Sequence, residues 1–297
     1  MKQEKNRYCV YTAITGDYDE ILQPKVVDNR FDYILFSDNL SERQEGVWQI
    51  RPIPYQNCNL VKMARYVKCH PTELLPDYVS SLWIDASICL VSPEIYERYI
   101  ALESSSDIMA AIKHPERNCA YEEMLAVISR GFEREKTILK WGRFLRRAHY
   151  PRNYGLTETN MLYRKHIKAI MDIDLLWWQC IERYSQRDQL SFDYCLWKTK
   201  TYYTPLLENN ETAWNSNIAE YHPQHKNAKR KNVATKTKEG WIARWSSHAP
   251  GRDNRAADYY YHVCGLPCPT FAAYVMGQWL RLSDIINNFL NKRSDNA

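Results

Sequence analysis

The stretch Ser81–Val91, SLWIDASICLV, has the composition of a buried β-strand, with apolar residues on both sides of Asp85. A carboxylate inside an apolar strand is costly to bury unless a partner compensates its charge. Asp85 is therefore the first candidate for a functional residue, and Ser87, two residues further on, is its candidate helper.

Further segments of the same kind alternate with helical segments along the chain. The other predicted strands are 8–15, 32–38, 47–53, 107–113 and 159–164. The predicted helices are 58–69, 93–102, 121–144, 167–184 and 189–198. Because strands that alternate with helices form parallel sheets covered on both faces, we expect an α/β fold with a mainly parallel sheet.

Composition narrows the class of protein. The chain has 297 residues, of which 45% are hydrophobic and 25% charged, and this balance excludes a mostly disordered chain. The chain is rich in aromatic residues, with ten Trp and 22 Tyr. Such residues can line a binding site for sugars or bases, although packing in the core is the better explanation for any single aromatic residue. The net charge is +5. No nucleic-acid-binding motif accompanies it, so we expect no nucleic-acid partner.

The cysteines and the N-terminus indicate a location. Nine cysteines without a CxxC pair are typical of reduced thiols in a cytosolic protein. The charged N-terminus lacks the apolar core of a signal peptide, and no stretch is apolar and long enough to span a bilayer. We expect a cytoplasmic protein, with peripheral contact at the inner face of the membrane as an option.

The pattern changes after residue 225, so we expect one domain over 1–225 and an extension over 226–297. The extension begins with a run of six cations between Lys226 and Lys238, which suits a solvated loop but also anionic lipid or a phosphorylated substrate. It ends in a predicted helix, Thr270–Leu290. Apolar residues recur there at helical spacing: Phe271, Tyr274, Val275, Trp279 and Leu280. Packing on the main domain is the preferred interpretation, and an amphipathic membrane-surface element is the alternative.

Polar residues follow several predicted strands, where ligands bind in parallel α/β sheets. Asp85-Ala86-Ser87 resembles the DxD element with which nucleotide-sugar glycosyltransferases hold Mn²⁺ or Mg²⁺ on a diphosphate, with Ser87 offering only a neutral oxygen. On the predicted helix 58–69, three cations spaced by three could hold the diphosphate: Lys62, Arg65 and Lys68. Asp188 starts a later helix, either as a simple N-cap or as a group that contacts the acceptor.

These motifs together resemble one family. The segments are YTAITGDYD, DYILFSDN, ARYVK, YVSSLWIDASI, IKHPERNCAYEE and YSQRDQLSFDY, in this order from Tyr8 to Trp197. They are similar to the TOD1/MUCI70 glycosyltransferase-like domain (formerly DUF616), in which the fourth motif is often WIDAN. The resemblance implies a GT-A-like fold, with a Rossmann-like nucleotide-binding half and an acceptor-binding half.

The resemblance also implies roles for individual residues. The donor side would comprise Thr12, Ala13, Thr15, Gly16, Tyr18, Asp38, Lys62, Arg65, Lys68, Asp85 and Ser87. The catalytic group would comprise His114, Asp188 and Gln189. The acceptor side would add Arg117, Glu122, Glu123 and Arg187. The metal ligands would be Asp85 and His222, with His225 as the alternate to His222.

The function expected from these residues is transfer of a sugar from a nucleotide-sugar, first of all a UDP-sugar, to a saccharide or lipid-linked glycan. A divalent metal, Mn²⁺ or Mg²⁺, would assist, and the pathway would be surface-polysaccharide or glycan biosynthesis. Two alternatives stay open. One is a non-catalytic carbohydrate- or nucleotide-binding protein on the same fold. The other is a hydrolase that uses Asp85 and Asp188.

Overall fold

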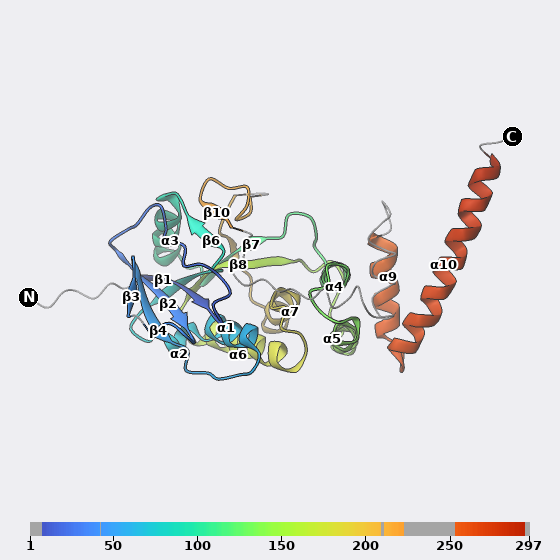
Figure 1. Cartoon of the computed structure of the whole chain (residues 1–297), viewed down its shortest axis with the longest axis horizontal. Helices are drawn as coiled ribbons and strands as arrows, with labels where there is room; N and C mark the ends of the chain where they lie inside the picture. Colours follow the sequence, from blue (N-terminus) through green and yellow to red (C-terminus); the bar gives the residue numbers. More distant parts are fainter. Residues whose placement is uncertain (1–7, 42, 209–210, 223–252, 295–297) are drawn as a thin grey trace, which may run out of the picture. The chain divides into compact units, whose positions relative to one another are not determined.

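The computed structural model describes residues 8–41, 43–208, 211–222 and 253–294 (Figure 1). The chain forms two compact units, one of residues 1–118 and 153–230 and the other of residues 119–152 and 231–297. We call them the sheet unit and the helical unit. Residues 119–152, which the sequence interpretation places in the first domain, thus cluster with the C-terminal region. The expected boundary at 225/226 lies outside the described residues.

The sheet unit is built on an eight-stranded sheet with the order β3-β4-β2-β1-β5-β8-β7-β9. Its strands are β1 Tyr8–Ile14, β2 Phe31–Ser37, β3 Gln44–Glu45, β4 Trp48–Pro52, β5 Ser80–Ile84, β7 Met109–Lys113, β8 Thr157–Lys165 and β9 Thr204–Pro205. The β4-β2-β1-β5 block is parallel throughout, whereas β8 runs antiparallel to both β5 and β7. The predicted α/β fold with a mainly parallel, mixed sheet flanked by helices is confirmed.

Helices cover both faces of this sheet (Figure 1). On one face lie α1 Leu60–Cys69, α2 Pro71–Leu74, α6 Lys168–Arg183 and α7 Gln189–Thr199. On the other face lie α3 Glu94–Ser104 and the antiparallel pair of β6 Ile88–Leu90 with β10 Ala219–Tyr221. Since side chains alternate along a strand, Leu82 and Ile84 enter the core beneath α3, and Trp83 points to the face that carries α1.

The segment that decides the fold differs from its prediction in one respect. One continuous strand was expected over 81–91, but the structure has two strands, β5 and β6, with a turn between them. The N–H of Asp85 still donates to the carbonyl of Asn160 in β8, at 2.8 Å. The carbonyl of Asp85 then accepts from the N–H of Ile88, at 2.9 Å, which closes a β-turn with Asp85 in its first position. Asp85 therefore lies at the carboxyl end of β5, not inside a strand.

The helical unit contains α4 Ala120–Ser129, α5 Glu135–Arg147, α9 Asp253–Cys264 and α10 Pro269–Ser294. The predicted terminal helix is confirmed as α10, whereas α9 was not expected. Buried tyrosines of α9 join the helices: Tyr260 donates to Glu135 of α5, and Tyr259 donates to the carbonyl of Ala273 of α10. None of the helices within the described residues is long and apolar enough to cross a membrane.

Candidate functional site

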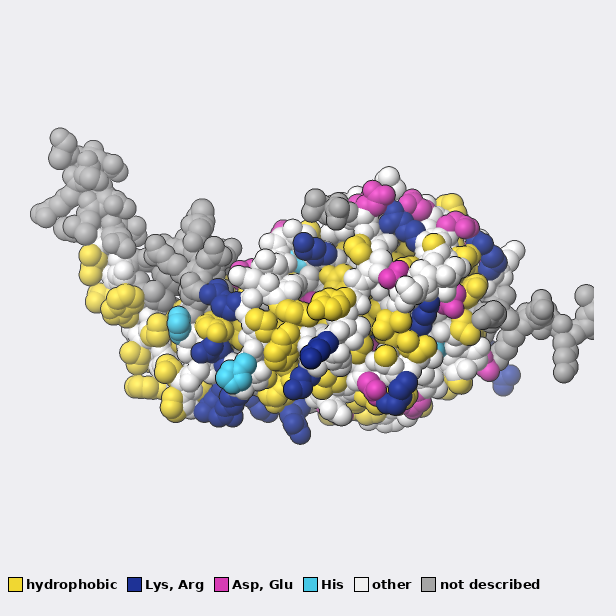
Figure 2. Space-filling view, turned by 180° about the vertical axis from the view of Figure 1, so that it is seen from behind, with side chains coloured by type: hydrophobic (Ala, Val, Ile, Leu, Met, Phe, Trp, Pro, Cys, Tyr) yellow, Lys and Arg dark blue, Asp and Glu magenta, His cyan; other side chains and the backbone are white. Residues whose placement is uncertain are grey.

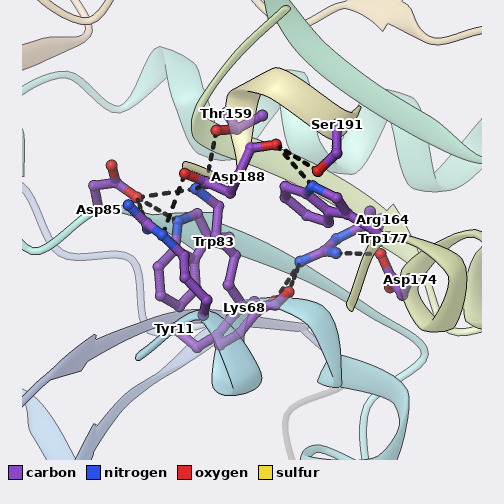
Figure 3. A network of polar contacts seen from close by, with 11 residues as sticks. Tyr11, Lys68, Trp83, Asp85, Thr159, Arg164, Asp174, Trp177, Asp188 and Ser191 are labelled. Atoms are coloured by element: carbon purple, nitrogen blue, oxygen red, sulfur yellow. Dashed lines mark hydrogen bonds and ion pairs between the residues drawn. The ribbon is translucent and has the colours of Figure 1, made fainter. Parts of the chain in front are cut away.

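Asp85 and Asp188 meet at one edge of the sheet unit through a shared cation (Figure 3). Lys68 lies in the last turn of α1 and is completely buried. Its Nζ lies 2.5 Å from Oδ2 of Asp188 and 3.2 Å from Oδ1 of Asp85. Two indole rings enclose the ammonium, with centroids at 5.3 Å (Trp83) and 5.7 Å (Trp177). A buried ammonium is stable in such a place only because carboxylates offset its charge.

Arg65, one turn earlier on α1, reinforces this arrangement. Its Nε lies 3.2 Å from Oδ1 of Asp188, and its Nη1 lies 3.7 Å from Oδ1 of Asp85. The two cations and two carboxylates balance in charge. We call these four residues the carboxylate cluster.

Asp188 is the buried member of the carboxylate cluster, with 3% of its surface exposed. It occupies the N-cap position of α7, but its side chain makes no capping hydrogen bond. Instead it accepts from Thr159 at 2.8 Å, besides the contacts with Lys68 and Arg65. Burial alone would raise the pKa of Asp188, but the nearby charges of Arg65, Lys68 and Arg187 outweigh it and hold the pKa well below its usual range. The carboxylate therefore stays ionised.

Asp85 is the accessible member, with 30% of its side chain exposed. Its Oδ1 accepts from the indole N–H of Trp83 at 2.8 Å, besides the contact with Lys68. Within the described part of the chain, no hydrogen bond or ion pair involves Oδ2 of Asp85, which carries no dashed line in Figure 3. One oxygen is thus fixed, and the other is available to a ligand.

A second, buried set of contacts positions the end of α1 (Figure 3). Arg164 of β8 donates to the carbonyl of Lys68 at 2.6 Å and to the hydroxyl of Tyr11 at 2.5 Å. The same guanidinium pairs with Asp174 of α6 at 2.5 Å. Arg164 therefore ties the last turn of α1, which carries Lys68, to the sheet and to α6.

The predicted nucleotide-side residues gather around the ends of β1 and β2. Asp38 accepts from the N–H of Gly16 at 2.9 Å, and Thr15 donates to the carbonyl of Leu60 at 3.0 Å. Gly16 has a φ of +60°, and a Cβ on it would meet the side chain of Leu60. The remaining predicted residues lie on β1 or in the turn after it: Thr12, Ala13 and Tyr18.

The side chain of Lys62 points towards α6. Its ammonium donates to the carbonyl of Glu182 near the end of α6, at 3.0 Å. It is therefore not part of the carboxylate cluster, although it shares α1 with Arg65 and Lys68.

Ser87 and His222 come together through the pairing of β6 with β10. The N–H of His222 donates to the carbonyl of Ser87 at 2.8 Å. Both residues line a pocket of about 340 Å³. Its other lining residues are Asp19, Glu20, Leu22, Ala86 and Tyr221. His225, the alternate candidate, lies outside the described residues.

The predicted catalytic and acceptor-side residues fall in different parts of the chain. His114 follows β7 and is nearly buried, and its Nδ1 accepts from the N–H groups of Glu116 and Arg117. Arg187 and Gln189 flank Asp188 at the start of α7. Glu122 and Glu123 lie in the first turn of α4 in the helical unit.

Several residues of the site were not expected. Trp83 precedes Asp85 by two residues and could have been found from the alternation of side chains along a strand. Thr159, Trp177, Arg164 and Asp174 carry no signal of their own in the sequence, because their role depends on how β8, α6 and α7 pack against α1.

A sequence model of the family described as "TOD1/MUCI70, glycosyltransferase-like domain" matches residues 1–222. The chain belongs to the TOD1/MUCI70 glycosyltransferase-like domain family. The family suspected from the motifs is thereby confirmed, and membership supports a glycosyltransferase-like function.

Among solved structures, the apo structure of the bifunctional glycosyltransferase WbbM matches with a TM-score of 0.36 and 9% sequence identity. The match covers 67% of this chain and 38% of that chain, so the TOD1/MUCI70 chain spans well under half the length of that protein. No curated protein matches the chain at a significant level.

Proposed function

We propose that this chain is a glycosyltransferase that transfers a sugar from a nucleotide-sugar, in the first place a UDP-sugar, to a saccharide or lipid-linked glycan acceptor. The cytoplasm and surface-polysaccharide or glycan biosynthesis are the setting we propose for it. The observation that carries the proposal is Asp85, whose Oδ1 is held by Trp83 and Lys68 at the carboxyl end of β5 while Oδ2 is unengaged. Ligands of α/β sheets bind at this edge.

A divalent metal, Mn²⁺ or Mg²⁺, belongs to the proposal, with Asp85 and His222 as the residues that would hold it. When bound, such an ion neutralises charge on the departing diphosphate. A carboxylate oxygen is a ligand that suits both Mn²⁺ and Mg²⁺, and an imidazole nitrogen is a common metal ligand in proteins. Among the residues that the structure describes, no group of three or more His, Cys, Asp or Glu side chains could hold an ion. Phosphate oxygens and water would therefore have to supply the remaining ligands, as is common for Mg²⁺.

The burial of Lys68 and Asp188 refines their proposed roles. Lys68 is fully buried and already shared by two carboxylates, so we propose that it orients Asp85 instead of meeting the diphosphate directly. Arg65 has 16% of its side chain exposed and is the better candidate for that contact. A carboxylate whose pKa is strongly lowered is a weak proton acceptor, so Asp188 is proposed to hold the two cations. His114 and Gln189 stay proposals for the catalytic group. For the acceptor side the proposed residues stay Arg117, Glu122, Glu123 and Arg187.

A thermal-shift screen tests the donor site. The purified protein is melted with UDP-, GDP-, CMP- and dTDP-sugars, each with and without Mn²⁺, alongside Asp85→Asn, His222→Ala and the control Asp172→Asn. Asp172 is exposed on α6 and pairs only with Lys168 within the described residues. We expect one nucleotide-sugar to raise the Tm in the presence of Mn²⁺. Asp85→Asn should abolish this rise, and the control Asp172→Asn should keep it.

Product analysis then separates the three functions. Transfer of the sugar to an added acceptor supports the proposed function. Binding without turnover would support a non-catalytic binding protein, and release of free sugar without any acceptor would support a hydrolase. Full transfer activity in Asp85→Asn would overturn the assignment of the site.

A further inference from the structure

Helix α10 exposes a continuous apolar face. Seven large apolar side chains on it are between 47% and 67% exposed: Phe271, Tyr274, Val275, Trp279, Leu282, Ile285 and Ile286. At 100° per residue these positions fall within an arc of about 140° around the helix. A solvent-exposed helix of a soluble domain normally carries polar residues on such an arc, so a face of this kind marks an interaction surface.

The helix packs through a different set of residues. Ala273 is buried, and its carbonyl accepts from Tyr259 of α9, while Gly277, one turn further on, is also buried. Ala273 and Gly277 thus lie on the packed side of α10, and the large apolar residues lie on the other side of the helix. The preferred interpretation of the sequence, that this helix packs on the main domain, stays a prediction; within the helical unit the large residues form the exposed side.

A neighbouring helix of the same unit adds a row of cations. Along α5, Lys136, Lys140, Arg143 and Arg147 follow the spacing i, i+4, i+7, i+11, which places them in one stripe. Glu135, the only acid of α5, is buried and accepts from Tyr260. Figure 2 shows hydrophobic side chains along the C-terminal helix and Lys and Arg side chains gathered beside them on the same face of the molecule.

We propose that the helical unit binds the surface of a bilayer that contains anionic lipid. The apolar face of α10 would lie in the plane of the interface, with Phe271, Tyr274 and Trp279 at the depth that aromatic rings prefer. The cations of α5 would meet the anionic headgroups. This inference concerns α10 and α5 only and does not depend on the proposed sugar transfer.

Charge favours a membrane over a second copy of the chain. The helical unit has 17 basic and 9 acidic residues, a formal charge of +8, whereas the sheet unit has 23 and 26, a formal charge of −3. Two helical units that met through α10 would bring like charges together, which is unfavourable. An anionic bilayer, by contrast, attracts Lys and Arg side chains that lie near its surface.

Vesicle sedimentation of the full chain tests this. Sucrose-loaded vesicles of phosphatidylcholine alone, or with about one-third phosphatidylglycerol, are mixed with four proteins at about 0.1 M salt. The proteins are the wild type, an apolar-face variant (Trp279→Gln, Leu282→Gln, Ile286→Gln), a cation variant (Lys136→Gln, Lys140→Gln, Arg147→Gln) and a charge-matched control (Lys113→Gln, Lys198→Gln, Lys200→Gln). The three control lysines are exposed in the sheet unit. Circular dichroism and thermal melting check that each variant folds.

We expect the wild type to bind the anionic vesicles at least tenfold more tightly than the neutral ones. The apolar-face and cation variants should each lose at least tenfold of that affinity, and the control should lose much less. No sedimentation of the wild type with anionic vesicles would overturn the proposal. So would equal losses in the cation variant and its control, or a wild-type dimer in analytical ultracentrifugation that the apolar-face variant abolishes.

Discussion

The Nζ atom of Lys68 lies 2.5 Å from Oδ2 of Asp188, although 120 residues separate the two in the chain. The same ammonium reaches Asp85, so a single buried cation connects the end of α1, the end of β5 and the start of α7. Two of these three elements carry segments of the family resemblance, YVSSLWIDASI and YSQRDQLSFDY. Their proximity therefore has a physical cause, which is the need of Lys68 for two carboxylates.

Replacing Lys68 by Met should destabilise the protein by about 3–5 kcal/mol, because it removes one partner of a buried ion pair. The free energy of unfolding is measured by urea denaturation. Lys198→Met, which removes an exposed lysine of α7, should cost no more than about 0.5 kcal/mol.

A double variant separates lost charge from lost packing. In Lys68→Met with Asp188→Asn, the carboxylate that lost its partner is also neutralised, so at least half of the lost stability should return. If the two substitutions simply add, the buried pair is not what stabilises this edge of the sheet.

Replacing Trp83 by Phe removes the indole N–H that fixes Oδ1 of Asp85 and keeps most of the ring that packs on Tyr11. A hydrogen bond to a charged group contributes about 1.5–3 kcal/mol. If Asp85 binds the donor, the Kd of the nucleotide-sugar identified in the screen should rise about tenfold or more. Titration calorimetry measures it. An unchanged Kd together with lowered stability would make Trp83 a packing residue only.

Gly16 lies in the turn after β1, against Leu60 at the start of α1. A substitution there tests whether the backbone of this turn requires glycine. At a φ of +60°, an alanine side chain is strained, and its Cβ would lie 2.3 Å from Cδ1 of Leu60. Gly16→Ala should cost about 1–2 kcal/mol for the left-handed conformation, plus the cost of moving Leu60. In a Leu60→Ala background only the conformational part should remain. An equal cost in both backgrounds would show that Leu60 adapts freely.

The sequence predicted the site in part, and the reason is physical. Asp85 was recognisable because an acid interrupts an apolar segment, and Lys68 because it recurs with Arg65 on one helix. The turn at 85–87 was missed because apolar residues on both sides gave the appearance of one strand. The contacts of Thr159 and Trp177 depend on β8 lying next to β5 in antiparallel orientation, and no local pattern specifies which strands become neighbours.

The last prediction concerns Asp193 of α7, which is buried and accepts two hydrogen bonds from Thr157. Burial raises the pKa of Asp193 to about 6, although the bonds from Thr157 lower it. An unfolded Asp titrates near pH 3.9, about two pH units lower. Between these values the native state binds more protons than the unfolded state, so this residue favours folding below about pH 4 and loses that contribution as the pH rises towards 6.

His166 has the opposite effect. Its burial lowers the pKa of its imidazole to about 4. The contribution of His166 to stability is therefore complete only above about pH 6.5 and is lost as the pH falls. The pH-dependent contributions of Asp193 and His166 to stability offset each other in the wild type. Each contribution is therefore measured as the difference in unfolding free energy between a variant and the wild type. From pH 4 to 7, the unfolding free energy of Asp193→Asn relative to the wild type should rise by about 2 kcal/mol, measured by urea denaturation at each pH. That of His166→Gln should fall over the same range. A difference for Asp193→Asn that stays constant with pH would mean that Asp193 titrates alike in both states, against its burial beside Thr157.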